Sequence, residues 1–126
     1  MEWKIIIKEP AMQLLDSLSE NEIEKVFAVF SVLKTDGPNL SRPYSDTLYG
    51  SKYTNLKELR VSTKGAVLRF FYVFDAERHI VLCGGNKRGK DSRLFYTQMI
   101  ALAEQIYDEH LAELSKKGNS DERCHF

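Results

Sequence analysis

The 126-residue chain contains only two cysteines, Cys83 and Cys124, which lie far apart in the sequence. They provide neither the disulfide framework of a small secreted domain nor a CxxC pair for zinc. The three histidines, His79, His110 and His125, are also separated and lack the HExxH spacing of a metal-binding helix. We therefore expect no metal site and no cofactor.

Long apolar runs are also missing. The run at residues 5–7 holds three aliphatic side chains, whereas a membrane-spanning helix needs about 18 or more. The N-terminus has no basic segment followed by an apolar stretch, so we expect no secretion signal and no membrane contact. We expect a cytoplasmic protein.

Glycine-rich phosphate loops are absent as well, because neither GxGxxG nor GxxxxGK followed by Ser or Thr occurs. The pair Gly84 and Gly85 is instead typical of a bulge or a close approach between strands. Nucleotide-binding enzymes of the common classes are thus disfavoured.

The chain also has no net charge, because 18 Lys and Arg residues balance 18 Asp and Glu residues. The charges are unevenly distributed. Residues 52–93 contain ten Lys or Arg against four acids, so this third carries a charge of about +6 and the remainder about −6. A neutral chain has no global attraction to nucleic acid, so any such role requires a local basic patch.

The length and the hydrophobic content of 43% fit a single globular domain. We expect this domain to cover residues 1–117. Residues 118–126, which read GNSDERCHF, are expected to form a flexible C-terminal tail.

The first third of the chain predicts a strand followed by a helical hairpin. Residues 2–8 are a β-branched run that ends before Pro10, a residue suited to the first turn of a helix. Leucines spaced three and four apart predict a helix over residues 11–18. The sequence SENE at residues 19–22 matches a capping box and predicts a second helix, which should end at the DGP sequence of residues 36–38.

The rest of the chain predicts a loop, three strands and a long helix. Residues 39–51 are rich in Ser, Pro, Gly and Asn and are expected to form the loop. Antiparallel strands are expected at residues 55–61, 66–74 and 80–86. A helix capped by Asp91 should run to about residue 116, and at this length part of it should project from the domain or contact a partner. The fold class is α+β in the order β-α-α-β-β-β-α.

Arg69 is the lone charge in an otherwise apolar strand. Alternation places it on the face opposite Leu68 and Phe70, so it either has a function or lies beside solvent at the strand surface. The basic residues after the third strand are equally open to two interpretations, a binding loop or an ordinary solvated turn: Lys87, Arg88, Lys90 and Arg93.

Several short motifs occur together in a fixed order. Residues 46–60 read DTLYGSKYTNLKELR, Gly65 precedes Arg69 by four positions, residues 82–87 read LCGGNK, Phe95 and Tyr96 are adjacent, and residues 107–111 read YDEHL. This combination, over residues 44–112, resembles the RelE/HigB-type toxins of bacterial type II toxin–antitoxin modules, within the RelE/ParE superfamily.

The resemblance implies a small RelE-like, microbial RNase-like fold, with an antiparallel sheet packed on a helical hairpin and a long C-terminal helix. It implies a metal-independent endoribonuclease, an mRNA interferase that inhibits translation, commonly on the ribosome. It also implies a cognate helix-turn-helix antitoxin and a toxin–antitoxin hetero-oligomer. By matching position, the resemblance assigns catalysis to Arg60, Arg69 and Lys87, and we expect the neighbouring basic and aromatic residues to bind RNA: Lys52, Tyr53, Lys57, Arg88, Lys90 and Tyr96.

Metal-free RNA cleavage uses the 2′-hydroxyl as nucleophile and needs a proton acceptor, charge stabilisation at the phosphate and protonation of the leaving oxygen. Arginine suits the second task, which we assign to Arg69 with Arg60 beside it. Lys87 or Lys52 could act as the base if neighbouring cations lower its pKa. One of three tyrosines could stack on an RNA base or donate a proton: Tyr53, Tyr72 or Tyr96.

Two alternatives stay open at this stage. ParE-like toxins share the fold and act on DNA gyrase without nuclease activity. The basic surface could also belong to a binding module with no catalysis.

Overall fold

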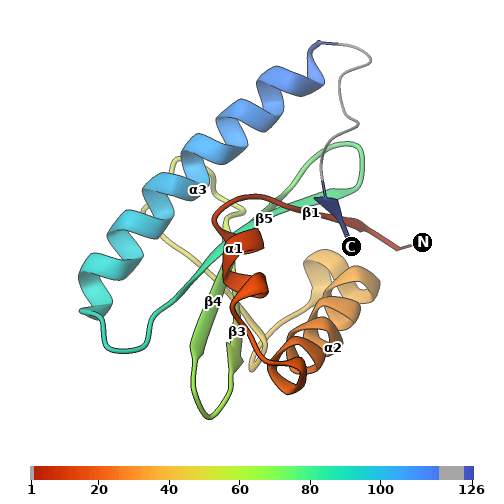
Figure 1. Cartoon of the computed structure of the whole chain (residues 1–126). Coiled ribbons are helices and arrows are strands. Elements are labelled where there is room, and N and C mark those ends of the chain that lie inside the picture. The colour runs from red at the N-terminus through yellow and green to blue at the C-terminus, as the bar shows by residue number, and fades with distance from the viewer. Residues whose placement is uncertain (1, 117–123) are drawn as a thin grey trace.

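The computed structural model describes residues 2–116 and 124–126 (Figure 1). Its elements follow the expected order, with a short 3-10 turn and two short strands added. They are β1 (Lys4–Ile7), α1 (Ala11–Asp16), α2 (Glu20–Asp36), η1 (Gly37–Asn39), β2 (Ser45–Thr47), β3 (Lys57–Ser62), β4 (Val67–Phe74), β5 (His79–Asn86), α3 (Ser92–Leu114) and β6 (Cys124–His125).

The strands form one six-stranded sheet in the order β2-β3-β4-β5-β1-β6. Neighbours from β2 to β5 are antiparallel, which was expected for β3, β4 and β5. β1 joins the other side of β5 in the parallel direction, with Ile5 opposite Ile80. The sheet is therefore mixed, and β4 and β5 lie at its centre.

Two segments differ from the sequence-based expectation. The loop expected over residues 39–51 contains β2, whose Ser45 is opposite Leu59 and is hydrogen-bonded through its hydroxyl to Tyr72. The polar sequence SDT has no alternation of apolar and polar residues that would predict a strand. The hydrogen bond between Ser45 and Tyr72 spans 27 positions, so no local pattern shows it. Of the expected tail, residues 118–123 lie outside the described part, and β6 pairs antiparallel with β1.

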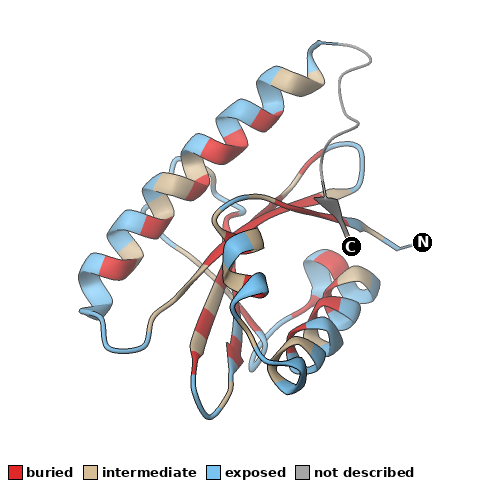
Figure 2. Cartoon of the chain, in the orientation of Figure 1, coloured by how far each residue is buried: buried red, intermediate tan, exposed pale blue. Residues whose placement is uncertain are grey.

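The sheet has two covered faces, because alternate strand residues point in opposite directions. Leu68, Phe70 and Tyr72 of β4 pack against α1 and α2 in the larger core cluster. Phe71 and Val73, on the other face, pack against α3. Figure 2 shows buried residues along the strands and on the helix surfaces that face them.

Local structure confirms the predicted ends of α2 and the predicted start of α3, whereas α1 ends at Asp16 and not at residue 18. Ser19 and Glu22 form the reciprocal capping box at the start of α2. Gly37 ends α2 with φ of 54°, and a Cβ there would lie 2.3 Å from Trp3 Nε1, so only glycine fits. Asp91 caps α3 by accepting from the Leu94 N–H at 2.9 Å.

α3 has 23 residues and is therefore about 35 Å long. Its buried residues begin at Phe95 and extend to His110, so the sheet and the neighbouring loop cover nearly the full length of its apolar stripe. No helix in the described residues is both long enough and apolar enough to cross a membrane.

Candidate functional site

A buried carboxylate, Glu58, lies at the centre of a polar cluster between β3, β4 and α3. Only 3% of Glu58 is exposed. Its Oε2 accepts from Arg60 Nε at 3.2 Å and from Arg60 Nη2 at 2.9 Å, and its Oε1 accepts from the Tyr96 hydroxyl at 2.6 Å. Glu58 and Arg60 are two positions apart on one strand, so both side chains lie on the face that α3 partly covers.

Arg69 joins this cluster from the neighbouring strand, where it is directly opposite Arg60. Its Nε donates to the Tyr96 hydroxyl at 3.2 Å and lies 3.8 Å from Glu58 Oε1. Two cations in opposite cross-strand positions repel each other. The Glu58 carboxylate between them offsets this repulsion, so the pair can be held together.

Lys87 follows β5 and completes the group. Its Nζ lies 5.4 Å from the centroid of the Tyr96 ring and 3.5 Å from Ser92 Oγ. The structure thus brings all three residues assigned to catalysis, Arg60, Arg69 and Lys87, to positions around Tyr96. Their roles remain predictions.

The two arginine side chains of the cluster differ in their exposure to solvent. The side chain of Arg60 is 43% exposed, whereas that of Arg69 is 13% exposed. The hydrogen bond to Glu58 raises the pKa of Arg60. Burial raises the pKa of Tyr96, and the bond from its hydroxyl to Glu58 raises it further, so the phenol is protonated at neutral pH. The site therefore presents two guanidinium groups, one ammonium and one phenol around a carboxylate.

Lys52 and Tyr53 lie elsewhere, in the loop between β2 and β3, and contact the second half of α3. Lys52 Nζ is 2.7 Å from Asp108 Oδ2, and the Tyr53 hydroxyl donates to the same carboxylate. Asp108 is about 18 Å along the helix from Tyr96, at 1.5 Å per residue. The hydrogen bond to Asp108 raises the pKa of Lys52, which is the opposite of the lowered pKa that a lysine base needs.

The remaining predicted RNA-binding residues divide between two faces. Arg88 donates to the Lys64 carbonyl at 2.9 Å, and Lys90 Nζ lies 5.8 Å from the Phe95 ring centroid, so both lie near Lys87. Lys57 points to the opposite face and donates to the Pro38 carbonyl at 3.2 Å. The structure does not bring Lys57 to the cluster.

Tyr72 does not offer a surface for a base. It is fully buried, and its hydroxyl is bonded to Ser45. Burial raises its pKa to about 12. Tyr72 is a core residue, and the hypothesis that it stacks on RNA or donates a proton is wrong.

Sequence reasoning missed Glu58, which was counted only as one of four acids in a basic segment. A signal was present in the ELR sequence of residues 58–60, because alternation puts Glu58 and Arg60 on one strand face. The hydrogen bond to Tyr96 spans 38 positions, and no local pattern predicts it.

Three other ligand-type side chains, Asp75, His79 and His110, also meet in the structure. Asp75 Oδ2 lies 2.8 Å from His79 Nδ1 and 2.8 Å from His110 Nε2. The sequence separates the two histidines by a strand and most of α3, so their spacing gave no sign of this cluster.

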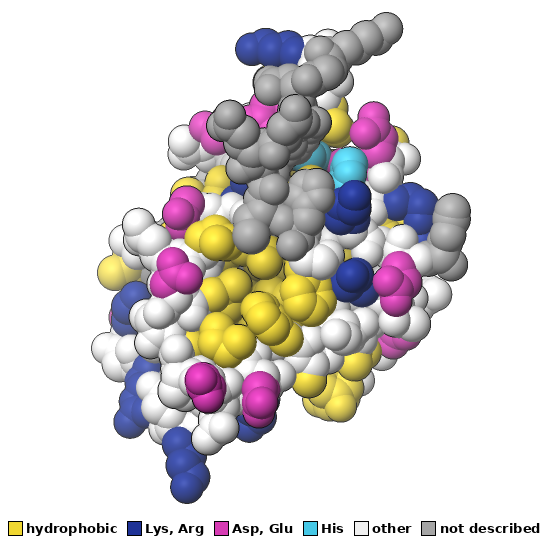
Figure 3. Space-filling model, turned by 45° about the vertical axis from the view of Figure 1, so that its right-hand side comes forward, with side chains coloured by type: hydrophobic (Ala, Val, Ile, Leu, Met, Phe, Trp, Pro, Cys, Tyr) yellow, Lys and Arg dark blue, Asp and Glu magenta, His cyan; other side chains and the backbone are white. Residues whose placement is uncertain are grey.

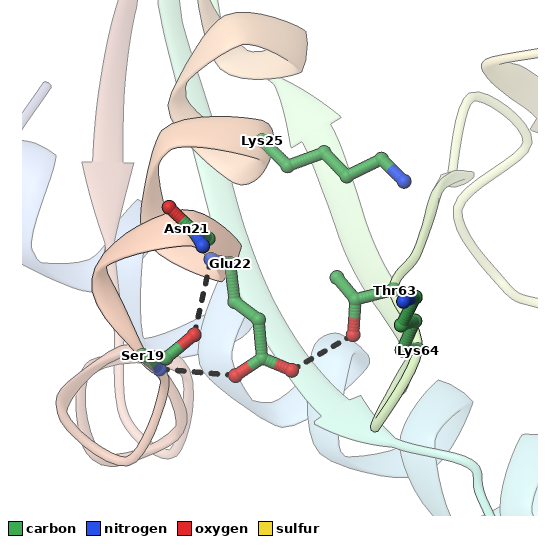
Figure 4. Close-up of a pocket in the computed structure, with 6 residues that line it drawn as sticks. All are labelled: Ser19, Asn21, Glu22, Lys25, Thr63 and Lys64. Carbon is green, nitrogen blue, oxygen red and sulfur yellow. Dashed lines mark hydrogen bonds between the residues drawn. The ribbon is translucent and has the colours of Figure 1, made fainter.

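A polar cleft of about 490 Å³ lies between the start of α2 and the turn after β3 (Figure 4). Within it, Glu22 accepts from the Ser19 N–H at 3.0 Å and from the Thr63 hydroxyl at 2.8 Å. Lys25 and Lys64 extend along its sides. The hydrogen bonds attach the β3–β4 turn to the helical hairpin.

Comparison with known proteins gives sequence relatives over most of the chain. Residues 13–108 match the family described as phage derived protein Gp49-like (DUF891). A candidate toxin of Mycobacterium tuberculosis, HigB2, is 39% identical over 101 residues, which are 79% of this chain and 50% of HigB2. This chain therefore spans about half the length of that relative. A second candidate toxin of the same organism, HigB3, is 34% identical over 97 residues, 76% of this chain and 82% of HigB3.

Two solved structures share the fold at low sequence identity. A chain of the RelE–RelB complex from the archaeon Pyrococcus horikoshii has a TM-score of 0.55 and 15% identity, covering 71% of this chain and 99% of that one. A mutant of the E. coli toxin RelE in the free state has a TM-score of 0.52 and 13% identity, covering 76% and 93%.

Proposed function

The chain belongs to the Gp49-like (DUF891) family, and from this membership we propose that it is the toxin of a type II toxin–antitoxin module. The activity that we propose is metal-independent endoribonuclease cleavage of mRNA, which inhibits translation. The observation that supports it best is the cluster of Arg60, Arg69 and Lys87 around Tyr96 and Glu58.

The two arginines suit a phosphodiester. In the resting structure, Arg60 donates two hydrogen bonds to one carboxylate oxygen, and a phosphate oxygen accepts from a guanidinium in the same way. We expect an RNA phosphate to take the place of this contact. Arg69, directly opposite, then stabilises the charge that develops on the phosphoryl oxygens.

Glu58 supplies the proton acceptor that the mechanism needs. When Arg60 turns to the phosphate, Glu58 Oε2 becomes available to accept the proton of the attacking 2′-hydroxyl. The bond from Tyr96 to Oε1 fixes the carboxylate during this change. Lys87, at the open side of the Tyr96 ring, is placed to donate a proton toward the departing 5′-oxygen.

Cleavage by purified protein with translating ribosomes tests the proposal. We expect Arg60→Ala to lower the rate of mRNA cleavage about 100- to 1,000-fold, the usual cost of removing one group that stabilises transition-state charge. Lys4→Met removes a positive charge from β1, away from the cluster, and should leave the rate unchanged. Because Arg60 is partly exposed, its replacement should leave the fold intact, and circular dichroism checks this.

Expression in cells separates the nuclease from the alternatives. We expect the wild type to arrest growth with cleaved mRNA visible in RNA profiling, and Arg69→Ala to lose both effects. Growth arrest with intact mRNA would contradict the nuclease activity, and inhibited gyrase supercoiling would then indicate a ParE-like toxin. No growth arrest at all would indicate a binding module.

We also propose a cognate antitoxin of helix-turn-helix type as partner. Figure 3 supports a surface for it, because hydrophobic side chains gather there on one face of the molecule. On α2, the side chain of Phe27 is 36% exposed. Co-expression with the product of the adjacent reading frame should abolish growth arrest. Phe27→Lys should weaken the complex while mRNA cleavage by the free protein persists.

A further inference from the structure

The cluster of Asp75, His79 and His110 contains three metal-ligating atoms in one place. Asp75 follows β4, His79 begins β5 and His110 lies near the end of α3. The three ligand atoms all lie within 4.8 Å of one another. Asp75 is 8% exposed and His110 is fully buried, whereas the side chain of His79 is 20% exposed. The cluster therefore has one side that solvent can reach.

The orientation of each ligand is fixed by its surroundings. The second oxygen of Asp75, Oδ1, accepts from the N–H groups of Glu77 and His79, both at 2.8 Å, which directs Oδ2 toward the two imidazoles. The Tyr107 ring stacks on His110 with centroids 6.1 Å apart. Such hydrogen-bonded carboxylates and oriented imidazoles are the usual supports of metal ligands in proteins.

We propose that Asp75, His79 and His110 bind a divalent transition-metal ion of the zinc class. Two imidazole nitrogens and one carboxylate oxygen are ligands that zinc accepts, and a water molecule from the His79 side would complete a tetrahedron. On binding, each neutral imidazole would carry its proton on the other ring nitrogen, and the ion would take the place of the hydrogen bonds to Asp75 Oδ2. These hydrogen bonds connect α3 to the β4–β5 turn without an ion, so the fold does not require the metal.

The site is separate from the proposed nuclease cluster. His110 and Tyr96 are 14 positions apart on α3, which corresponds to about 21 Å. The ion would therefore strengthen the attachment of α3 to the β4–β5 turn and take no part in RNA cleavage. Failure of the nuclease proposal would leave this one unaffected.

Metal titration of the full chain tests the proposal. The titrations use a Cys124→Ser, His125→Asn variant, which removes two other side chains that can bind zinc. This variant is first treated with EDTA to remove bound metal. Isothermal titration with ZnCl2 should show one ion per chain, and the thermal midpoint should rise with Zn²⁺ and not with Mg²⁺. Co²⁺ should give the visible absorption of a tetrahedral nitrogen and oxygen site.

His79→Asn is the decisive variant, because His79 is the most exposed ligand and its loss should leave the protein folded. We expect it to weaken zinc binding at least 100-fold, in line with the sensitivity of metal sites to their ligands and supports. Equal zinc affinity in this variant, or fewer than one ion for every two chains in its parent, would overturn the proposal. Glu77→Gln changes a charge beside the cluster and should keep the affinity of the parent.

Discussion

Tyr96 is the residue through which the two arginines and the buried carboxylate are connected. Its hydroxyl donates to Glu58 and accepts from Arg69, while its ring lies beside Lys87. The hydroxyl therefore fixes both the proposed proton acceptor and one of the phosphate-binding groups. A phenol does this without adding charge, because its pKa is raised by burial and by Glu58.

Removing this hydroxyl should reduce activity more than stability. We expect Tyr96→Phe to lower mRNA cleavage about 10- to 100-fold, since Glu58 loses a fixed hydrogen bond. The free energy of unfolding should fall by about 1 kcal/mol for the lost bond. Single-turnover cleavage and urea denaturation measure the two effects. Tyr49→Phe, at a side chain that is 85% exposed, is the matched control and should change neither quantity.

At the scale of single residues, the sequence predicted the cluster in part. Arg60, Arg69 and Lys87 meet because strand alternation and hairpin order place them on adjacent strands, and both patterns are visible in the sequence. Lys52 was placed wrongly because its position depends on a bond to Asp108, 56 positions away. Long-range side-chain bonds of this kind have no local signature.

Glu22 connects two elements, α2 and the turn between β3 and β4. It completes the capping box with Ser19 and also accepts from Thr63. The hydrogen bond from the Ser19 backbone N–H, and then the one from the Thr63 hydroxyl, lower the pKa of Glu22 below its ordinary value of 4.5. The stabilisation from the charged carboxylate is thus present above pH 4.5 and is lost as the pH falls through the lowered value.

The pH dependence of unfolding tests this connection. The urea midpoint of Glu22→Gln should lie below that of the wild type at pH 7, and the difference should shrink as the pH falls below 4.5. Glu24→Gln, two positions further along α2 at an exposed side chain, should leave the urea midpoint unchanged. A difference between Glu22→Gln and wild type that stays constant from pH 7 to pH 3 would show that the carboxylate charge is not the cause.

Gly84 sets the distance between β5 and the ring of Phe70. A Cβ at this position would lie 2.5 Å from Phe70 Cδ1 and 3.1 Å from the Arg69 carbonyl oxygen. We expect Gly84→Ala to destabilise the protein by about 1–3 kcal/mol, the usual cost of overpacking a core. Gly65→Ala is the control, because its Cβ would make an ordinary contact at 3.5 Å with Glu22. Thermal unfolding of the two variants measures the difference.

Most helices and strands were predictable because their signals are local. The capping box, the glycine stop after α2 and the alternation in β4 each lie within a few residues. β2 was missed because three polar residues carry no periodicity, and its pairing with β3 is a tertiary effect. The parallel pairing of β1 with β5 likewise depends on how the whole chain closes the sheet.

The whole molecule is neutral, although its charges are separated along the chain. The resemblance to RelE/HigB-type toxins is confirmed by the family match, the two relatives and the shared fold. Because the chain is neutral, the proposed RNA binding must depend on a few close contacts with phosphates. If three phosphates are contacted, the slope of log affinity against log salt should be about −2 for single-stranded RNA.

Fluorescence anisotropy with a non-cleavable RNA measures this slope. Raising the salt from 50 to 200 mM should weaken binding about 20-fold. Lys87→Met should make the slope less steep by about 0.7, the amount for one phosphate contact. Lys4→Met should leave the slope as it is. An affinity that does not change with salt would contradict a phosphate-binding surface.

Under the proposed function, the Glu58 carboxylate competes with a substrate phosphate for Arg60. Any phosphate must displace a carboxylate that is already attached to Arg60, so inorganic phosphate and dinucleotides should be poor inhibitors. A long RNA that also touches the outer basic side chains can make the exchange favourable. Under the proposed function, small anions should therefore bind weakly at Arg60, and a long RNA should bind there more strongly.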